Sequence, residues 1–383
     1  MIIILFSLCI QVVFFSYLFA LWLFNTSKLE VLQDYSDLIP KTASYELLEF
    51  EELEGNLSIE NEVPRLLEEL NYSCVYFVHG TFVGDDPFDI ISFIQNAFPS
   101  LSSTVVQSIR QGVKNGSNLI AREVGNFHPK LLERLQQHCP ENIHFENFTW
   151  SSSNHHIARI RGAVKLMRSI AKNTSKSEKI LLYGHSHAGQ LFALISHLLS
   201  NDSLTIHLKD FLIKYEIEKE ELEQLISQLK KRPMDFVTLG TPIRYPWSEK
   251  YLKNNMLLHF VNHRGKVPMG GSLSSSITTK SGDYIQQWAV AGSDSKVLVL
   301  EDKLRNEELD LILGIGSDVT SLRRNIKFKK RLHTRGHHFL VDFKDSSKIP
   351  NSFLTIFGHG VYTKRDQLLW IIYKSLTKIK RES

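Results

Sequence analysis

The chain has 383 residues, of which 43% are hydrophobic and 22% are charged, and its formal net charge is +4. This is the composition of an ordinary globular protein, and it excludes extensive disorder. Acidic and basic residues are interspersed and no basic stripe is present, so we expect no nucleic-acid partner.

The first 24 residues form an apolar segment that contains no charged side chain. A helix of about 20 apolar residues can cross the hydrocarbon core of a bilayer. A cleaved signal peptide normally has a basic start and a small-x-small cleavage site, and neither is present here. The sequence of residues 1–24 therefore predicts a single-pass transmembrane anchor or an uncleaved signal, with a removed signal or an apolar segment buried in the fold as the alternatives. The charge of the flanking residues favours a catalytic body outside the cytoplasm.

Residues 25–70 are polar and acidic, and they read as a stalk or linker. From residue 71 onward, short apolar runs alternate with amphipathic segments such as 155–172 and 188–199. The runs expected to be strands are 74–80, 143–150, 179–186, 234–242, 256–263, 286–294 and 339–343. Strands that alternate with helices predict an α/β domain over residues 71–383, with a doubly wound, mostly parallel sheet.

Two stretches interrupt this alternation. Residues 201–232 contain a charged amphipathic helix, and residues 265–285 are rich in Gly, Ser and Thr. Each could be a lid or insertion that covers a site, and each could equally be a surface excursion.

A serine stands on a tight turn between an apolar run and a helix. The sequence Gly184-His185-Ser186-His187-Ala188 places small residues two positions before and after Ser186. It resembles the nucleophile elbow G-x-S-x-G of the α/β-hydrolase superfamily, with Ala188 in place of the last glycine. The resemblance covers residues 72–383 and implies that Ser186 is the nucleophile. Without this context Ser186 could simply cap the following helix.

An apolar run that ends in His79-Gly80-Thr81 precedes the elbow. In the superfamily such a loop donates one backbone N–H to the oxyanion hole, and the residue after the nucleophile donates the other. The resemblance therefore implies Thr81 and His187 as oxyanion donors, with Gly80 beside them. The alternative is that Gly80 belongs to an ordinary turn.

The base and acid of a triad follow the serine in this superfamily, in the order Ser, Asp or Glu, His. His359 lies between two glycines near the C-terminus and is the expected base, ahead of His337 and His338. Asp294 is the expected acid, with Asp342 and Asp302 as alternatives. A residue after the run 256–263 also competes, although Arg264 and Gly265 hold the position where the family often has an acid.

These expectations together describe a serine esterase or lipase-like hydrolase. The substrate would be a carboxylic ester of a lipid or another apolar acyl chain, cleaved through an acyl-enzyme. A thioesterase or acyltransferase would use the same triad, and a non-catalytic membrane-tethered binding module could keep the same fold. We expect no cofactor and no metal, because adjacent residues such as His155 and His156 diverge on a helix.

Overall fold

The computed structural model describes residues 43–50, 56–80, 127–174, 179–263, 282–287, 297, 299–314, 332–343 and 358–383. Seven parallel strands form one sheet in the order β1-β7-β6-β5-β4-β2-β3. The strands are β1 (Ser44–Glu49), β2 (Tyr72–Val78), β3 (His144–Phe148), β4 (Lys179–His185), β5 (Met234–Leu239), β6 (Leu257–Asn262) and β7 (His337–Asp342). The predicted α/β class with a parallel sheet is confirmed.

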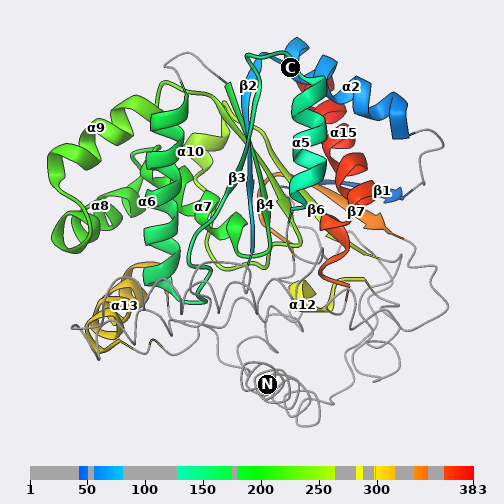
Figure 1. The fold of residues 1–383 in the computed structure, drawn as a ribbon. Coiled ribbons are helices and arrows are strands. Elements are labelled where there is room, and N and C mark those ends of the chain that lie inside the picture. The colour runs from blue at the N-terminus through cyan, green and yellow to red at the C-terminus, as the bar shows by residue number, and fades with distance from the viewer. Residues whose placement is uncertain are drawn as a thin grey trace, which may run out of the picture.

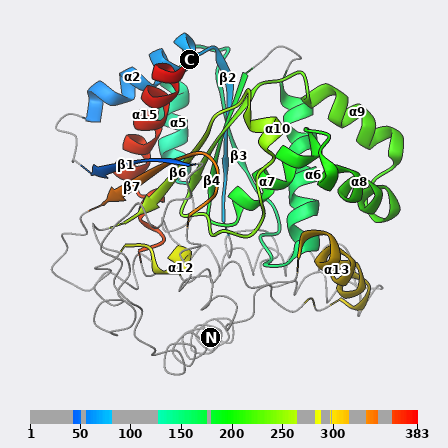
Figure 2. The same ribbon diagram turned by 180° about the vertical axis from the view of Figure 1, so that it is seen from behind.

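Helices cover both faces of the sheet (Figures 1 and 2). One layer consists of α2 (Asn56–Glu69), α5 (Pro129–His138) and α15 (Arg365–Glu382). The other contains α6 (His156–Asn173), α7 (Ala188–Leu198), α8 (Ser203–Tyr215), α9 (Lys219–Leu229) and the short α10 (Glu249–Leu252). The remaining elements are α12 (Tyr284–Gln287), α13 (Leu300–Leu313) and the 3-10 turn η3 (Val361–Thr363).

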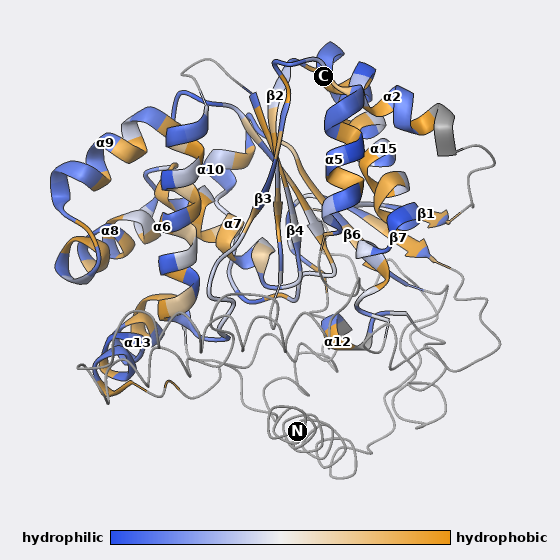
Figure 3. Ribbon diagram, in the orientation of Figure 1, coloured by the Kyte–Doolittle hydropathy of each residue, from blue (hydrophilic) through white to orange (hydrophobic). Residues whose placement is uncertain are grey.

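Alternate residues of the strands face opposite helix layers, which explains why the strands are apolar throughout. On β4, Ile180 and Leu182 pack with α6 and α7 in one core, whereas Leu181 and Tyr183 pack with α15 in the other. The outer helices carry both hydrophobic and hydrophilic residues (Figure 3). On α9 the buried side chains are Leu222, Leu225, Ile226 and Leu229.

The structure differs from the sequence prediction at two places. Residues 44–49 and 56–69, expected within a stalk, form strand β1 and helix α2 of the domain. The stretch 201–232, for which a lid and a surface excursion were both open, contains α8, which packs against α7, and α9, which packs against α6. Gln286 and Gln287, expected to begin a strand, belong to α12, and the rest of the run 286–294 lies outside the described residues.

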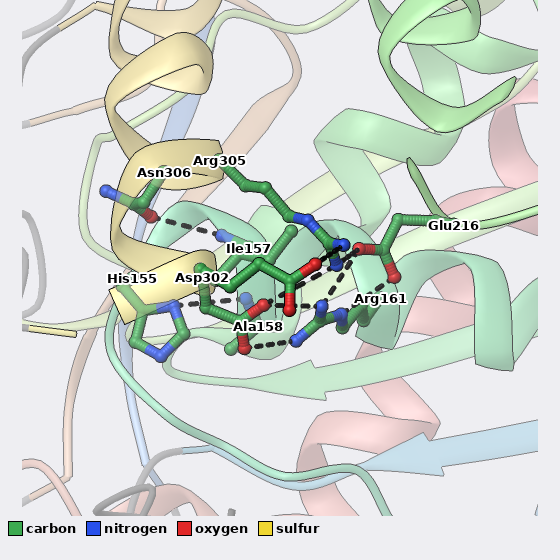
Figure 4. Close-up of polar contacts among 9 residues, drawn as sticks. His155, Ile157, Ala158, Arg161, Glu216, Asp302, Arg305 and Asn306 are labelled. Atoms are coloured by element: carbon green, nitrogen blue, oxygen red, sulfur yellow. Dashed lines mark hydrogen bonds and ion pairs between the residues drawn. The ribbon is translucent and has the colours of Figure 1, made fainter. Parts of the chain in front are cut away.

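Helix α13 is fixed to the first turns of α6 by polar contacts (Figure 4). Arg161 donates to both carboxylate oxygens of Asp302 at 2.7 Å, and to the two oxygens of Glu216 at 2.7 and 2.9 Å. The side-chain oxygen of Asn306 accepts the backbone N–H of Ile157 at 3.2 Å. Asp302 is thus committed to the contact between α13 and α6.

The predicted anchor, residues 1–24, lies outside the described residues. Among the helices that the structure does describe, none combines the length and the apolar character needed to cross a bilayer. The anchor, and the membrane location that depends on it, remain predictions.

Candidate active site

Ser186 lies where β4 turns into α7, at the carboxyl end of the sheet. Its φ is +55°, a left-handed conformation that a residue with a side chain rarely adopts. Helix α7 begins at Ala188 with His187 as its N-cap residue, so Ser186 does not cap the helix. The backbone of Ser186 is held on both sides, since its N–H donates to Leu239 at 2.8 Å and its carbonyl accepts the Thr241 hydroxyl at 2.7 Å.

The turn is too crowded for larger residues at its small positions. A Cβ on Gly184 would lie 2.5 Å from the ring of Phe192 and 3.2 Å from the backbone of Ala188. A Cβ on Gly189 would lie 2.3 Å from the hydroxyl oxygen of Thr241. Packing therefore requires glycine at Gly184 and Gly189.

The loop after β2 lies directly against the serine. Val78 pairs with Gly184 in the sheet, which brings the two strand ends to the same level. A Cβ on Gly80 would lie 2.6 Å from the Cβ of Ser186 and 2.9 Å from the carbonyl oxygen of His185. Only glycine lets this loop approach the serine so closely.

Contacts of His79 hold the start of this loop, His79 and Gly80, in place. The carbonyl of His79 accepts the indole N–H of Trp150 at 2.9 Å, and its Nδ1 lies 3.0 Å from the carbonyl oxygen of Gly80. Trp150 is fully buried, so the position of the loop is determined by the core.

The expected base, His359, contacts a buried carboxylate that the sequence analysis did not select. The Nδ1 of His359 lies 2.7 Å from Oδ2 of Asp283, whose side chain is completely buried. His359 itself is buried, and its Nε2 has no hydrogen-bond partner among the described residues. A histidine oriented in this way by a carboxylate has its second nitrogen available to accept a proton.

Asp283 is attached to the carboxyl end of β6. Its N–H donates to the carbonyl of Asn262 at 2.9 Å, and its Oδ1 accepts the N–H of Gln286 at 2.8 Å. The side chain of Asn262 also donates to the carbonyl of Gly358 at 3.0 Å. The end of β6 therefore joins the loop of the acid to the loop of the histidine.

His185, the residue before the serine, joins the elbow to His359. Its Nε2 lies 2.9 Å from the carbonyl oxygen of His359, and the centroids of the two imidazole rings are 4.7 Å apart. This contact fixes the histidine loop next to the elbow.

The residues predicted for the site fall into three groups. Ser186, His187, Gly80 and His359 lie at one end of the sheet. Thr81 and Asp294 lie outside the described residues, so their roles stay predictions. His337 and His338 begin β7, and Asp342 ends that strand.

Asp283 carries no sequence motif that would single it out as a triad acid. It follows Gly282 near the end of the stretch 265–285, whose composition fits a lid and a surface excursion equally. Its one local signal is an aspartate immediately before a short helix, which is also typical of an ordinary helix cap.

The arrangement can activate a hydroxyl group. A serine on a left-handed strand-to-helix turn, an imidazole oriented by a buried carboxylate and a glycine beside the serine are the kinds of group that acyl transfer uses. Within the described residues no group of three or more His, Cys, Asp or Glu side chains is placed to hold a metal ion. His155 instead caps α6 through the N–H of Ala158.

The chain matches no protein-family model, and neither a curated protein nor a solved structure matches it. Any functional conclusion therefore depends on the geometry of the site.

Proposed function

We propose that the protein is a serine hydrolase of the α/β-hydrolase type that cleaves a carboxylic ester through Ser186, His359 and Asp283. The proposal is carried by the left-handed Ser186 between β4 and α7, since its neighbour His185 contacts His359 and His359 is paired with a buried carboxylate at 2.7 Å. Asp283 replaces Asp294 as our candidate for the acid.

In the proposed reaction His359 Nε2 takes the hydroxyl proton while Ser186 Oγ attacks the ester carbonyl. The protonated histidine then gives that proton to the departing alcohol, which leaves an acyl-serine. Water attacks the acyl group with the same histidine as base, and the acid is released. The backbone N–H groups of His187 and Thr81 would stabilise the oxyanion, a contribution of a few kcal/mol per donor.

A lipid or another apolar acyl ester is the substrate class that we favour. The reason is the apolar segment 1–24, which would keep the site beside a bilayer. Thioester hydrolysis and acyl transfer to an alcohol proceed through the same acyl-serine, and they differ in the leaving group or the acceptor.

A fluorophosphonate probe tests the proposal, because it reacts only with an activated serine. The full-length chain in detergent should be labelled, and labelling should disappear in Ser186→Ala and His359→Ala. Ser200→Ala is a matched control, since Ser200 is a buried serine at the other end of α7. Labelling that persists in Ser186→Ala would mean that another residue is the nucleophile. A folded wild type that is not labelled would favour a non-catalytic binding module.

A further inference from the structure

Asp283 receives a hydrogen bond from a second side chain besides His359. The hydroxyl of Tyr362 donates to Oδ2 of Asp283 at 2.9 Å, the same oxygen that His359 contacts. Tyr362 lies three residues after His359, in the turn η3, so one short segment supplies both groups.

The tyrosine hydroxyl is fixed as a donor to the carboxylate. The backbone N–H of Asn262 donates to its oxygen at 2.7 Å, which leaves the hydroxyl proton for Asp283. Burial, together with the negative charge of Asp283, raises the pKa of Tyr362 well above its ordinary value. The hydroxyl therefore stays protonated across the working range of an esterase.

Tyr362 cannot meet the substrate itself, because its side chain has no exposed surface. A Cβ on Gly240 would lie 2.6 Å from the Tyr362 ring and 2.6 Å from Oδ2 of Asp283. Tyrosine, carboxylate and the end of β5 are thus packed against one another, and the carboxylate has no room to turn away from His359.

We propose that Tyr362 is a positioning residue of the triad, which donates to Asp283 and thereby moderates the effect of the carboxylate on the imidazole of His359. This inference rests on the proposed function. A hydroxyl that donates to the carboxylate shares its negative charge, so the charge acting on His359 is smaller. Without the hydroxyl, Asp283 should stabilise the protonated imidazole more strongly.

The test is the pH dependence of fluorophosphonate labelling in Tyr362→Phe. The acid limb of the rate profile should move to higher pH by about 0.5 to 1 pH unit, since a hydrogen bond to a charged group is lost. On that limb the labelling rate should fall about threefold to tenfold, while the plateau at high pH changes little. A purely structural residue would lower the rate equally at every pH.

The chain offers a matched control at the opposite end of the sheet. Tyr72 is buried, its hydroxyl donates to Oδ2 of buried Asp235, and the N–H of Met256 donates to Oδ1 at 2.6 Å. This repeats the pattern at Asp283, with Lys179 Nζ at 3.0 Å from Oδ2 of Asp235 in place of the histidine. Tyr72→Phe should lower the melting temperature without moving the acid limb.

The outcomes separate the two proposals. A labelled wild type whose acid limb stays in place in Tyr362→Phe, or moves equally in Tyr72→Phe, overturns the role of Tyr362 and leaves the hydrolase standing. A wild type that is not labelled overturns both. If Tyr362→Phe does not fold, 3-fluorotyrosine at position 362 replaces it. This residue is a stronger donor, so the limb should move to lower pH, and an unmoved limb overturns the proposal.

Discussion

At Ser186 the chain adopts a φ of +55°, which costs of the order of 1 kcal/mol or more for a residue with a side chain. The surroundings over-determine this conformation through the bonds to Leu239 and Thr241 and the packing of Gly80. Strain that is held by several independent contacts is typical of a functional position, and a helix-capping serine would need none of it.

A further prediction about single residues is that Asp283, and not Asp294, is the acid that pairs with His359. Asp283→Asn should lower ester hydrolysis and fluorophosphonate labelling about a hundredfold to ten-thousandfold, because an amide cannot hold the imidazole in the required tautomer. Asp294→Asn should keep most of the activity. Rates of both variants, measured beside their melting temperatures, decide the question. An inactive Asp294→Asn with an active Asp283→Asn would restore the original assignment.

The residues that sequence reasoning found share one property, which is that their signal is local. Ser186 stands between small residues on a strand-to-helix turn, and His359 stands between two glycines. Asp283 has no such signal, because it is positioned by the hydrogen bond from its N–H to the carbonyl of Asn262. The stretch 264–281 separates these two residues in the sequence. A contact between distant segments leaves no spacing in the sequence from which it could be predicted.

At the scale of elements, β6, β7 and the residues just before β7 bring three buried histidines together, and one of them, His333, also contacts the carbonyl of Thr241 at 3.1 Å. The centroid of His259 lies 4.3 Å from that of His333 and 4.6 Å from that of His338, with the rings stacked in both pairs. Burial lowers the pKa of all three: well below the ordinary value for His259, to about 4 for His333 and to about 3 for His338. The neighbouring histidines lower the pKa of His259 and His338 further.

These lowered pKa values predict acid sensitivity with a definite sign. The unfolded chain binds protons at an ordinary histidine pKa of about 6.5, whereas in the folded chain His333 binds a proton only near pH 4 and His338 only near pH 3. Stability is therefore complete above about pH 6.5 and falls as the pH is lowered toward 4, by up to about 2 kcal/mol per histidine between pH 7 and 5.

Chemical denaturation at pH 7, 6 and 5 checks this expectation. His338→Phe should flatten the dependence, because the variant lacks one group that binds a proton on unfolding. His207→Phe, at an exposed position on α8, should keep the dependence of the wild type. Equal slopes in His338→Phe and the wild type would contradict the role of the stack.

At the scale of the whole molecule, the start of the domain differs from the sequence prediction for a physical reason. Residues 44–49 carry no continuous apolar run, since β1 lies at the edge of the sheet and pairs only with β7. An edge strand that is exposed on one side has a polar pattern, and in the sequence this pattern resembles that of an acidic stalk. The buried strands β2, β4, β5 and β6 were recognised because both of their faces are covered.

The position of this boundary gives the last prediction. A chain that begins at residue 71 lacks β1, which pairs with β7 from Ser44 to Glu49, and α2, which packs against α15. Six apolar side chains among the described residues leave the core, namely Phe50, Ile59, Val63, Leu66, Leu67 and Leu70. Their burial contributes roughly 9–18 kcal/mol, as much as the whole stability of a typical domain. We expect residues 43–383 to unfold cooperatively, whereas residues 71–383 should aggregate or lack a thermal transition by circular dichroism. A cooperative transition in residues 71–383 at the same temperature would show that β1 and α2 are dispensable, as a stalk would be.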